Sequence, residues 1–120
     1  MLNDAAKHLE AALDISTSLS VLQLKASALD SIGRLRLKEG KLDEALDSFS
    51  DCLTVSENSG YLLTKAQALG DMGTVYAQQG LAQKALDSLT QARDLFTKAG
   101  IKSRDLQNYQ NLIDKLNKSR

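Results

Sequence analysis

The strongest constraint on the fold is a segment that occurs twice in the chain, forty residues apart. Residues 29–49 read LDSIGRLRLKEGKLDEALDSF, and residues 69–89 read LGDMGTVYAQQGLAQKALDSL. The two copies share glycines at matching positions and the run Ala-Leu-Asp-Ser near their ends. Self-similarity at a fixed period of roughly 20–50 residues is typical of repeat proteins, in which each repeat packs on its neighbours. The chain is therefore predicted to be a solenoid.

The composition favours one helical domain over residues 1–120. This length is enough to bury a core, and the lack of any Pro or Trp argues against a β-rich fold. Fifteen Lys and Arg balance fifteen Asp and Glu, so no net charge attracts nucleic acid or an anionic membrane. No apolar run approaches the roughly 20 residues that span a bilayer, so no direct membrane insertion is expected. A single cysteine excludes an internal disulfide.

Apolar residues at spacings of three and four predict six helices and no strands. The helices are expected at about residues 3–18, 21–38, 42–56, 62–79, 82–98 and 103–118. Glycines mark the breaks, because Gly40 and its counterparts can take the left-handed conformation that ends a helix. Ser103 is expected to cap the last helix. The predicted units are a half repeat (3–18), two whole repeats (22–60 and 62–100) and a C-terminal capping helix (103–118).

The period extends to both ends of the chain, so the helices alternate between two types. With A for the first helix of a pair and B for the second, their order is B-A-B-A-B-A. Gly33 is predicted to let the next helix approach closely, with Ala45 as the matching small residue. A helical glycine costs about 1 kcal/mol relative to alanine, so its return at Gly73 indicates a packing role. Ile113 takes its place in the last helix, which no further helix follows.

These positions resemble the tetratricopeptide repeat (TPR) family. The second copy matches the family pattern at Leu69, Met72, Gly73, Tyr76, Gly80, Ala85, Leu89 and Ala92, and the first at Leu29, Ile32, Gly33, Arg36, Gly40, Ala45, Phe49 and Cys52. The departures are Leu for the initial Trp, Arg36 for the Tyr, no Pro, and a period longer than the usual value of about 34. The resemblance implies an all-α, right-handed TPR superhelix (α-solenoid) of six antiparallel helices.

In such a superhelix the A helices line a concave groove that can hold a peptide or helix of another protein. The side of the A helices opposite the core supplies the candidate partner-binding residues, which are Ser27, Asp30, Arg34, Lys38, Gln67, Gly70, Thr74, Gln78, Gln107, Gln110 and Asp114. Each can alternatively be an ordinary solvated position. Gly70 either permits close approach of a ligand or is a tolerated flaw in the helix.

The resemblance to chaperone-binding TPR domains fails at the positions that matter. Those domains hold a C-terminal carboxylate with Lys, Asn and Arg. The positions here are occupied by Asp30 and Arg34, Gly70 and Thr74, and Gln110 and Asp114. Only Arg34 has a suitable charge, so binding of an Hsp70 or Hsp90 C-terminus is not expected.

The sequence contains no residue set that suits catalysis, a metal or a cofactor. His8 is the only histidine, which excludes a multi-histidine metal site and leaves a triad without a second partner. Cys52 falls at a small packing position, which favours a core thiol over a nucleophile. No glycine-rich nucleotide-binding motif is present. The chain is therefore predicted to be a non-catalytic protein-binding domain without cofactor.

In size and repeat number the chain also resembles the TPR domain of the plastid FLU proteins of plants. That resemblance implies a negative regulator of tetrapyrrole and chlorophyll biosynthesis that binds the C-terminal region of glutamyl-tRNA reductase. It further implies a plastid location with a membrane tether outside this chain; a TPR domain of another kind is expected in the cytoplasm.

The alternative is a structural or oligomerising scaffold of a signalling or assembly complex. The first predicted helix is a B helix without its A partner, so Leu2, Leu9 and Leu13 lack a repeat neighbour. Terminal repeats need a polar outer face. We therefore expect either that the chain is excised from a longer protein or that it self-associates through this end.

Overall fold

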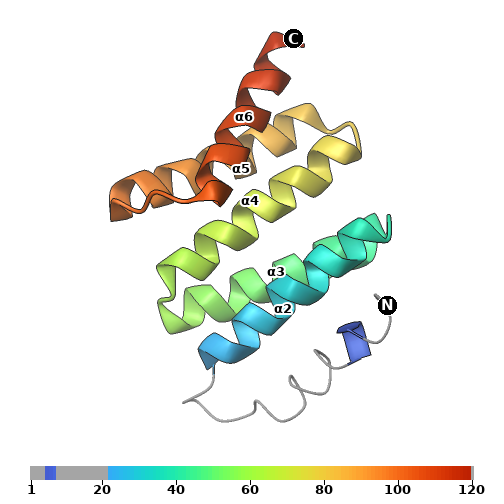
Figure 1. Ribbon diagram of the computed structural model, residues 1–120, viewed down its shortest axis with the longest axis vertical. Helices are drawn as coiled ribbons and strands as arrows, with labels where there is room; N and C mark the ends of the chain where they lie inside the picture. Colours follow the sequence, from blue (N-terminus) through green and yellow to red (C-terminus); the bar gives the residue numbers. More distant parts are fainter. Residues whose placement is uncertain (1–4, 8–21, 120) are drawn as a thin grey trace.

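The computed structural model describes residues 5–7 and 22–119, and the secondary structure of these residues is helical, with no strand. Beyond a short helical piece at 5–7, five helices stack side by side (Figure 1). They are α2 (Leu22–Lys38), α3 (Leu42–Ser59), α4 (Leu62–Gln78), α5 (Ala82–Ala99) and α6 (Arg104–Lys118). α2 pairs with α3 and α4 with α5, and α6 crosses this stack at its far end (Figure 1). The prediction of an all-α solenoid is confirmed.

The predicted helix boundaries need small corrections. α3 continues to Ser59, three residues beyond the predicted end, because the glycine that stops it is Gly60. α6 begins at Arg104, and the predicted cap is present: the hydroxyl of Ser103 accepts a hydrogen bond from the Leu106 backbone N–H at 3.2 Å. The helix predicted at residues 3–18 lies outside the described residues except for the piece at 5–7.

Both A helices in the body of the stack end in the same way. Gly40 and Gly80 have φ of +77° and +79°, a conformation that costs little without a Cβ atom. The next residue then folds its N–H back onto the helix, with Lys41 donating to the Arg36 carbonyl at 2.9 Å and Leu81 donating to the Tyr76 carbonyl at 2.9 Å. These bonds satisfy carbonyls that a helix end leaves unpaired.

The repeated helical glycines make room mainly for a side chain. A Cβ atom at Gly33 would overlap the ring of Phe49, so Phe49, rather than the predicted Ala45, is its partner. At Gly73 a Cβ atom would lie 2.6 Å from Cγ of Leu89 and 3.2 Å from the Ala85 carbonyl oxygen. Both glycines therefore serve packing, as predicted, but close backbone approach contributes only at the second one.

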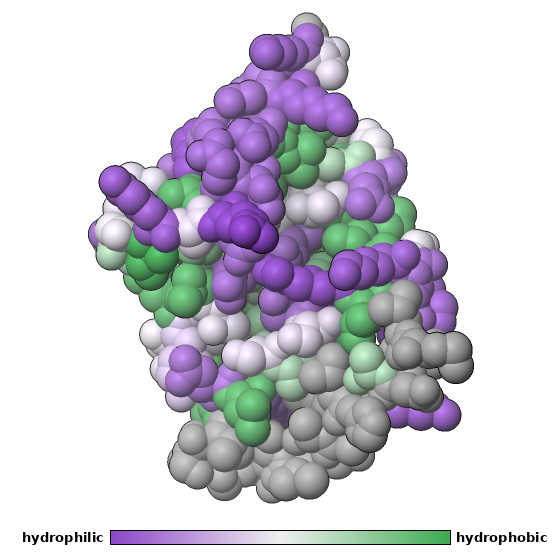
Figure 2. Space-filling model, in the orientation of Figure 1, coloured by the Kyte–Doolittle hydropathy of each residue, from purple (hydrophilic) through white to green (hydrophobic). Residues whose placement is uncertain are grey.

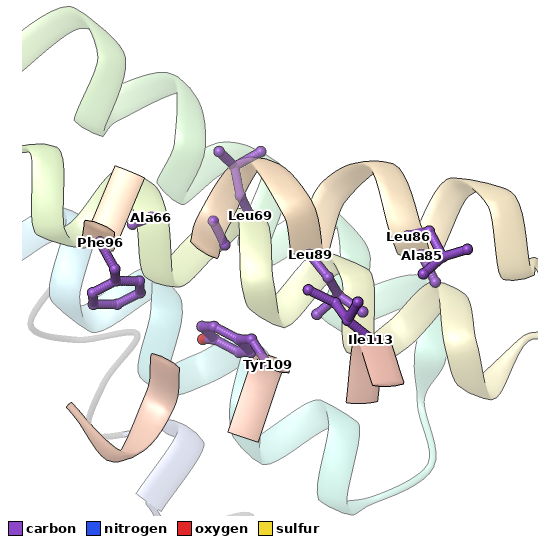
Figure 3. Close-up of a cluster of buried hydrophobic side chains, with 9 residues drawn as sticks. Ala66, Leu69, Ala85, Leu86, Leu89, Phe96, Tyr109 and Ile113 are labelled. Carbon is purple, nitrogen blue, oxygen red and sulfur yellow. The ribbon is translucent and has the colours of Figure 1, made fainter. Parts of the chain in front are cut away.

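The largest apolar cluster joins α4, α5 and α6 (Figure 3). Tyr109 and Ile113 are the buried residues of α6, and they point into the cluster beside Phe96 and Leu89 of α5 (Figure 3). The rings of Phe96 and Tyr109 lie 6.2 Å apart and are tilted by 44°, a favourable arrangement for two aromatic rings. Ile113, at the position that corresponds to Gly33 and Gly73, adds its own side chain to this cluster.

The departure from the family pattern at Arg36 is compensated within the same repeat. In the second copy, Lys84 lies over the Tyr76 ring with its Nζ 5.7 Å from the centroid. In the first copy, Arg36 pairs instead with Glu44, from Nε to Oε2 at 3.5 Å, and with Glu39, from Nη1 to Oε1 at 3.1 Å. Glu44 precedes Lys84 by forty positions. An ion pair therefore replaces a cation–π contact between the same two repeat positions.

Candidate functional site

A groove of about 320 Å³ opens between α2, α4 and the start of α6. Its lining residues are Arg34, Leu37, Lys38, Asp71, Thr74, Asp105, Asn108, Tyr109 and Leu112. Hydrophilic residues cover α6 and the strip between α6 and α2 in this orientation, whereas hydrophobic residues appear in patches towards the sides (Figure 2). The groove thus has leucine side chains on two of its walls and charged side chains at its centre.

Arg34 is the centre of an ion cluster that joins three helices. Its Nε lies 3.1 Å from Oδ2 of Asp30 on α2 and 3.1 Å from Oδ2 of Asp71 on α4. Its Nη2 lies 3.4 Å from Oδ2 of Asp105 on α6. Burial lowers the pKa of the Arg34 guanidinium, but Asp71, Asp30 and Asp105 together raise it by more than burial lowers it. The group therefore stays charged.

α6 makes further hydrogen bonds at the same place. The Tyr109 hydroxyl lies 2.9 Å from Oδ1 of Asp71 and 3.2 Å from the Gln67 carbonyl oxygen, both of which can accept its proton. Asp105 also accepts a hydrogen bond from Nε2 of Gln67 at 3.1 Å. Residues of α2 and α4 that were predicted to bind a partner, Arg34 and Gln67, are therefore engaged by the chain's own C-terminal helix.

Gly70 has a specific role that the sequence did not reveal. A Cβ atom at this position would overlap the ring of Tyr109. The close approach that Gly70 permits is thus used by α6, and not by a ligand as predicted. It is not a tolerated flaw either, because the Tyr109 ring fills the space that the missing side chain leaves.

The structure brings together only some of the predicted site residues. Arg34, Lys38 and Thr74 line the groove; Asp30 is buried behind it, and Ser27 and Gln78 are exposed on α2 and α4. On α6, Gln107 donates to Asn111 at 2.9 Å and Gln110 to Asp114 at 3.0 Å, and none of these lines the groove. Partner binding by the predicted residues stays a prediction.

The groove side of α6 differs from the prediction for a geometric reason. Its groove residues are Asp105, Asn108, Tyr109 and Leu112. The prediction took the α6 positions that lie forty residues after the candidates on α4. It thereby assumed that α2, α4 and α6 face the groove with equivalent sides. Because the groove lies between helices, the helix on its far side presents the side that faces back towards α4. The amphipathic spacing of Tyr109 and Leu112 was the available signal.

Of the chemically reactive candidates, Cys52 has a structural role, and His8 lies outside the described residues. Cys52 is fully buried, and its thiol donates to the Ala26 carbonyl at 3.1 Å. Burial raises the pKa of Cys52 to about 12, which suits a core thiol and not a nucleophile. Within residues 5–7 and 22–119, His, Cys, Asp and Glu form no group of three that could hold a metal ion. None of the described helices combines the length and the hydropathy that crossing a membrane requires.

Comparisons with known proteins identify the repeat. The family model described as "Tetratricopeptide repeat" matches residues 24–98. No curated protein matches the chain. Among solved structures, the crystal structure of BtubC (BKLC) from P. vanneervenii is similar in fold, with a TM-score of 0.86 at 18% sequence identity. The match covers 98% of this chain and 48% of that one, so the chain spans about half the length of this structural relative. The chain belongs to the tetratricopeptide repeat family, whose repeats generally mediate protein–protein interaction and are typically non-catalytic.

Proposed function

We propose that the groove between α2, α4 and α6 binds a segment of a partner protein. The observation that carries this proposal is an open groove with apolar walls next to exposed polar groups. Leu37 and Leu112 are half-buried on its two sides, where a partner side chain can cover them. Lys38 and Asn108 are exposed beside them and can hydrogen-bond a peptide backbone. A peptide or a helix that offers one apolar side chain between polar groups fits this arrangement.

The charges of the groove argue against a partner carboxylate at its centre. Arg34 already faces three carboxylates, those of Asp30, Asp71 and Asp105. A further carboxylate would have to displace Asp105 or place a fourth carboxyl group beside the one guanidinium. This supports the expectation that the chain does not bind the C-terminal carboxylate of Hsp70 or Hsp90. Asp105 keeps a quarter of its side chain exposed and offers an acceptor, so a partner donor suits the centre better.

Two narrower predictions remain as they were. Nothing in the comparisons supports a FLU-type regulator or glutamyl-tRNA reductase as the partner, and a plastid location rests on that resemblance alone. Self-association was predicted through Leu2, Leu9 and Leu13, which lie outside the described residues. The proposal therefore concerns the groove and leaves both predictions to separate tests.

The test uses peptides selected with the wild-type chain from a random-peptide display library. Their Kd is measured by fluorescence anisotropy for the wild type and for two matched double variants. Thr74→Arg with Asn108→Arg places two long side chains in the groove. Thr97→Arg with Asn58→Arg makes the same two exchanges at exposed positions of α5 and α3. Circular dichroism confirms that both variants keep their helices.

We expect the groove variant to weaken binding at least about tenfold, which corresponds to about 1.4 kcal/mol, and the control variant to bind like the wild type. Peptides that bind the groove variant as tightly as the wild type would overturn the proposal. Equal weakening in both variants would do the same, because it would place the binding surface elsewhere or reflect overall charge.

A further inference from the structure

We propose that Asp30 and Asp71 share one proton, and that this proton stabilises the docking of α6 across α2 and α4. Both residues are more than nine-tenths buried, and both approach the same atom, Nε of Arg34, at 3.1 Å. Because both Oδ2 atoms lie 3.1 Å from one nitrogen, the two carboxyl groups are close neighbours. The inference concerns the packing of the chain itself and stands whether or not the groove binds a partner.

The charges of the cluster favour such a proton. One guanidinium, with 42% of its side chain exposed, faces three carboxylates. Two of these carboxylates are buried side by side, and burial of two like charges in one site strongly favours protonation of one of them. Oδ1 of Asp30 is buried and has no hydrogen-bond partner among the described residues.

The groups that face Asp71 come from three neighbouring helices. α2 contributes Asp30 and Arg34, α6 contributes Asp105 and Tyr109, and α3 contributes the more distant thiol of Cys52. Burial and the neighbouring Asp71 raise the pKa of the Tyr109 phenol, and burial raises that of Cys52 to about 12. Both therefore stay neutral through the range below about pH 9, and Arg34 stays charged. The proton that Asp30 and Asp71 share is therefore the one whose loss can change the charge of these buried groups in that range.

The direction of the pH effect follows from Asp71. Burial and the Asp30 carboxyl hold the pKa of Asp71 well above its ordinary value, against the lowering effect of Arg34 and Tyr109. A group with a raised pKa in the folded state stabilises that state while it is protonated, and the contribution is lost as the pH rises through the folded-state pKa. Loss of the proton leaves two buried anions where Tyr109 attaches α6. α6 should therefore loosen as the pH rises.

The experiment compares the wild type with Asp30→Asn from about pH 4 to about pH 9. The amide of the variant supplies a permanent N–H towards Asp71 and removes the second charge, while the bonds of Asp71 to Arg34 and Tyr109 are kept. Asp47→Asn is the control, because it removes one exposed carboxylate from α3. The readouts are the Cγ chemical shift of Asp71 by NMR and the hydrogen-exchange protection factors of the α6 amides, corrected for intrinsic exchange.

In the wild type and in Asp47→Asn, we expect the Asp71 Cγ resonance to titrate well above the ordinary range for aspartate. The α6 protection factors should fall by up to about tenfold for each pH unit between the ordinary aspartate pKa of about 4 and that midpoint, and should level off above it. In Asp30→Asn the high midpoint should disappear, and protection should stay constant between about pH 6 and pH 9. An Asp71 midpoint at or below about 4 in the wild type would overturn the proposal. So would α6 protection in Asp30→Asn that falls with pH as in the wild type.

Discussion

The body of the stack and its C-terminal helix are held by different chemistry. In the body, Gly33 faces Phe49 and Gly73 faces Leu89, so two copies of one apolar contact join each A helix to its B helix. α6 has an apolar contact of its own kind, the Tyr109 ring over Gly70, but adds an ion cluster in which Arg34 meets carboxylates from three helices. The first kind of contact recurs with the repeat, and the second occurs once.

This difference follows from what each kind of contact asks of the sequence. A glycine opposite a large apolar side chain needs only shape, so it can be copied from one repeat to the next. The cluster needs particular charges at positions where the copies differ. Asp105 stands forty residues after Lys65 and eighty after Lys25, and Arg34 corresponds to Thr74 and Asp114. The ion cluster that holds α6 is thus built from residues that do not recur at the repeat period.

The largest effect is expected when a glycine is replaced by leucine. The same substitution at Gly73, inside the body, and at Gly70, under α6, tests the two kinds of contact separately. Gly73→Leu should lower the free energy of unfolding by about 3 kcal/mol or more, because the new side chain meets Leu89 and the Ala85 backbone inside the body. At Gly70 the atoms nearest to an added Cβ all belong to the Tyr109 ring, so Gly70→Leu should displace α6 and leave α2 to α5 folded. Urea unfolding gives the first value, and residue-resolved NMR shows which helices survive. A Gly73→Leu variant that unfolds like the wild type would contradict the packing role.

A smaller effect is expected from the cluster. Arg34→Met should lower the free energy of unfolding by about 1–3 kcal/mol, because it leaves buried carboxylates without their cation, and the partial exposure of the guanidinium limits the loss. Arg93→Met is the matched control, since among the described residues Arg93 pairs with the exposed, adjacent Asp94 at 3.2 Å; it should change stability by less than about 0.5 kcal/mol. Equal losses in the two variants, measured by urea unfolding, would show that the cluster is no stronger than a surface pair.

The features that the two repeat copies share could be predicted from the sequence. The contacts made by residues that differ between the copies could not. The helices from α2 to α5, the left-handed glycines and the buried position of Cys52 all followed from repetition and helical spacing. The roles of Asp71 and Asp105 did not, because neither residue recurs at the repeat period. Gly70 was recognised as unusual, yet its partner Tyr109 lies on another helix, at a distance that no local pattern encodes. Long-range contacts between unlike residues are the part that required the structure.

The central claim is that polar contacts with Asp71 fasten α6 across α2 and α4, and the most direct test is hydrogen exchange in Tyr109→Phe. The variant keeps the ring over Gly70 and removes only the hydroxyl that reaches Asp71 at 2.9 Å. Tyr76→Phe is the control, because its ring faces Lys84 instead. With a loss of about 1 kcal/mol for a buried hydrogen bond, protection of the α6 amides in Tyr109→Phe should fall about fivefold, while α2 to α5 stay as in the wild type and in Tyr76→Phe. Unchanged protection in α6, or an equal fall in every helix, would contradict the claim.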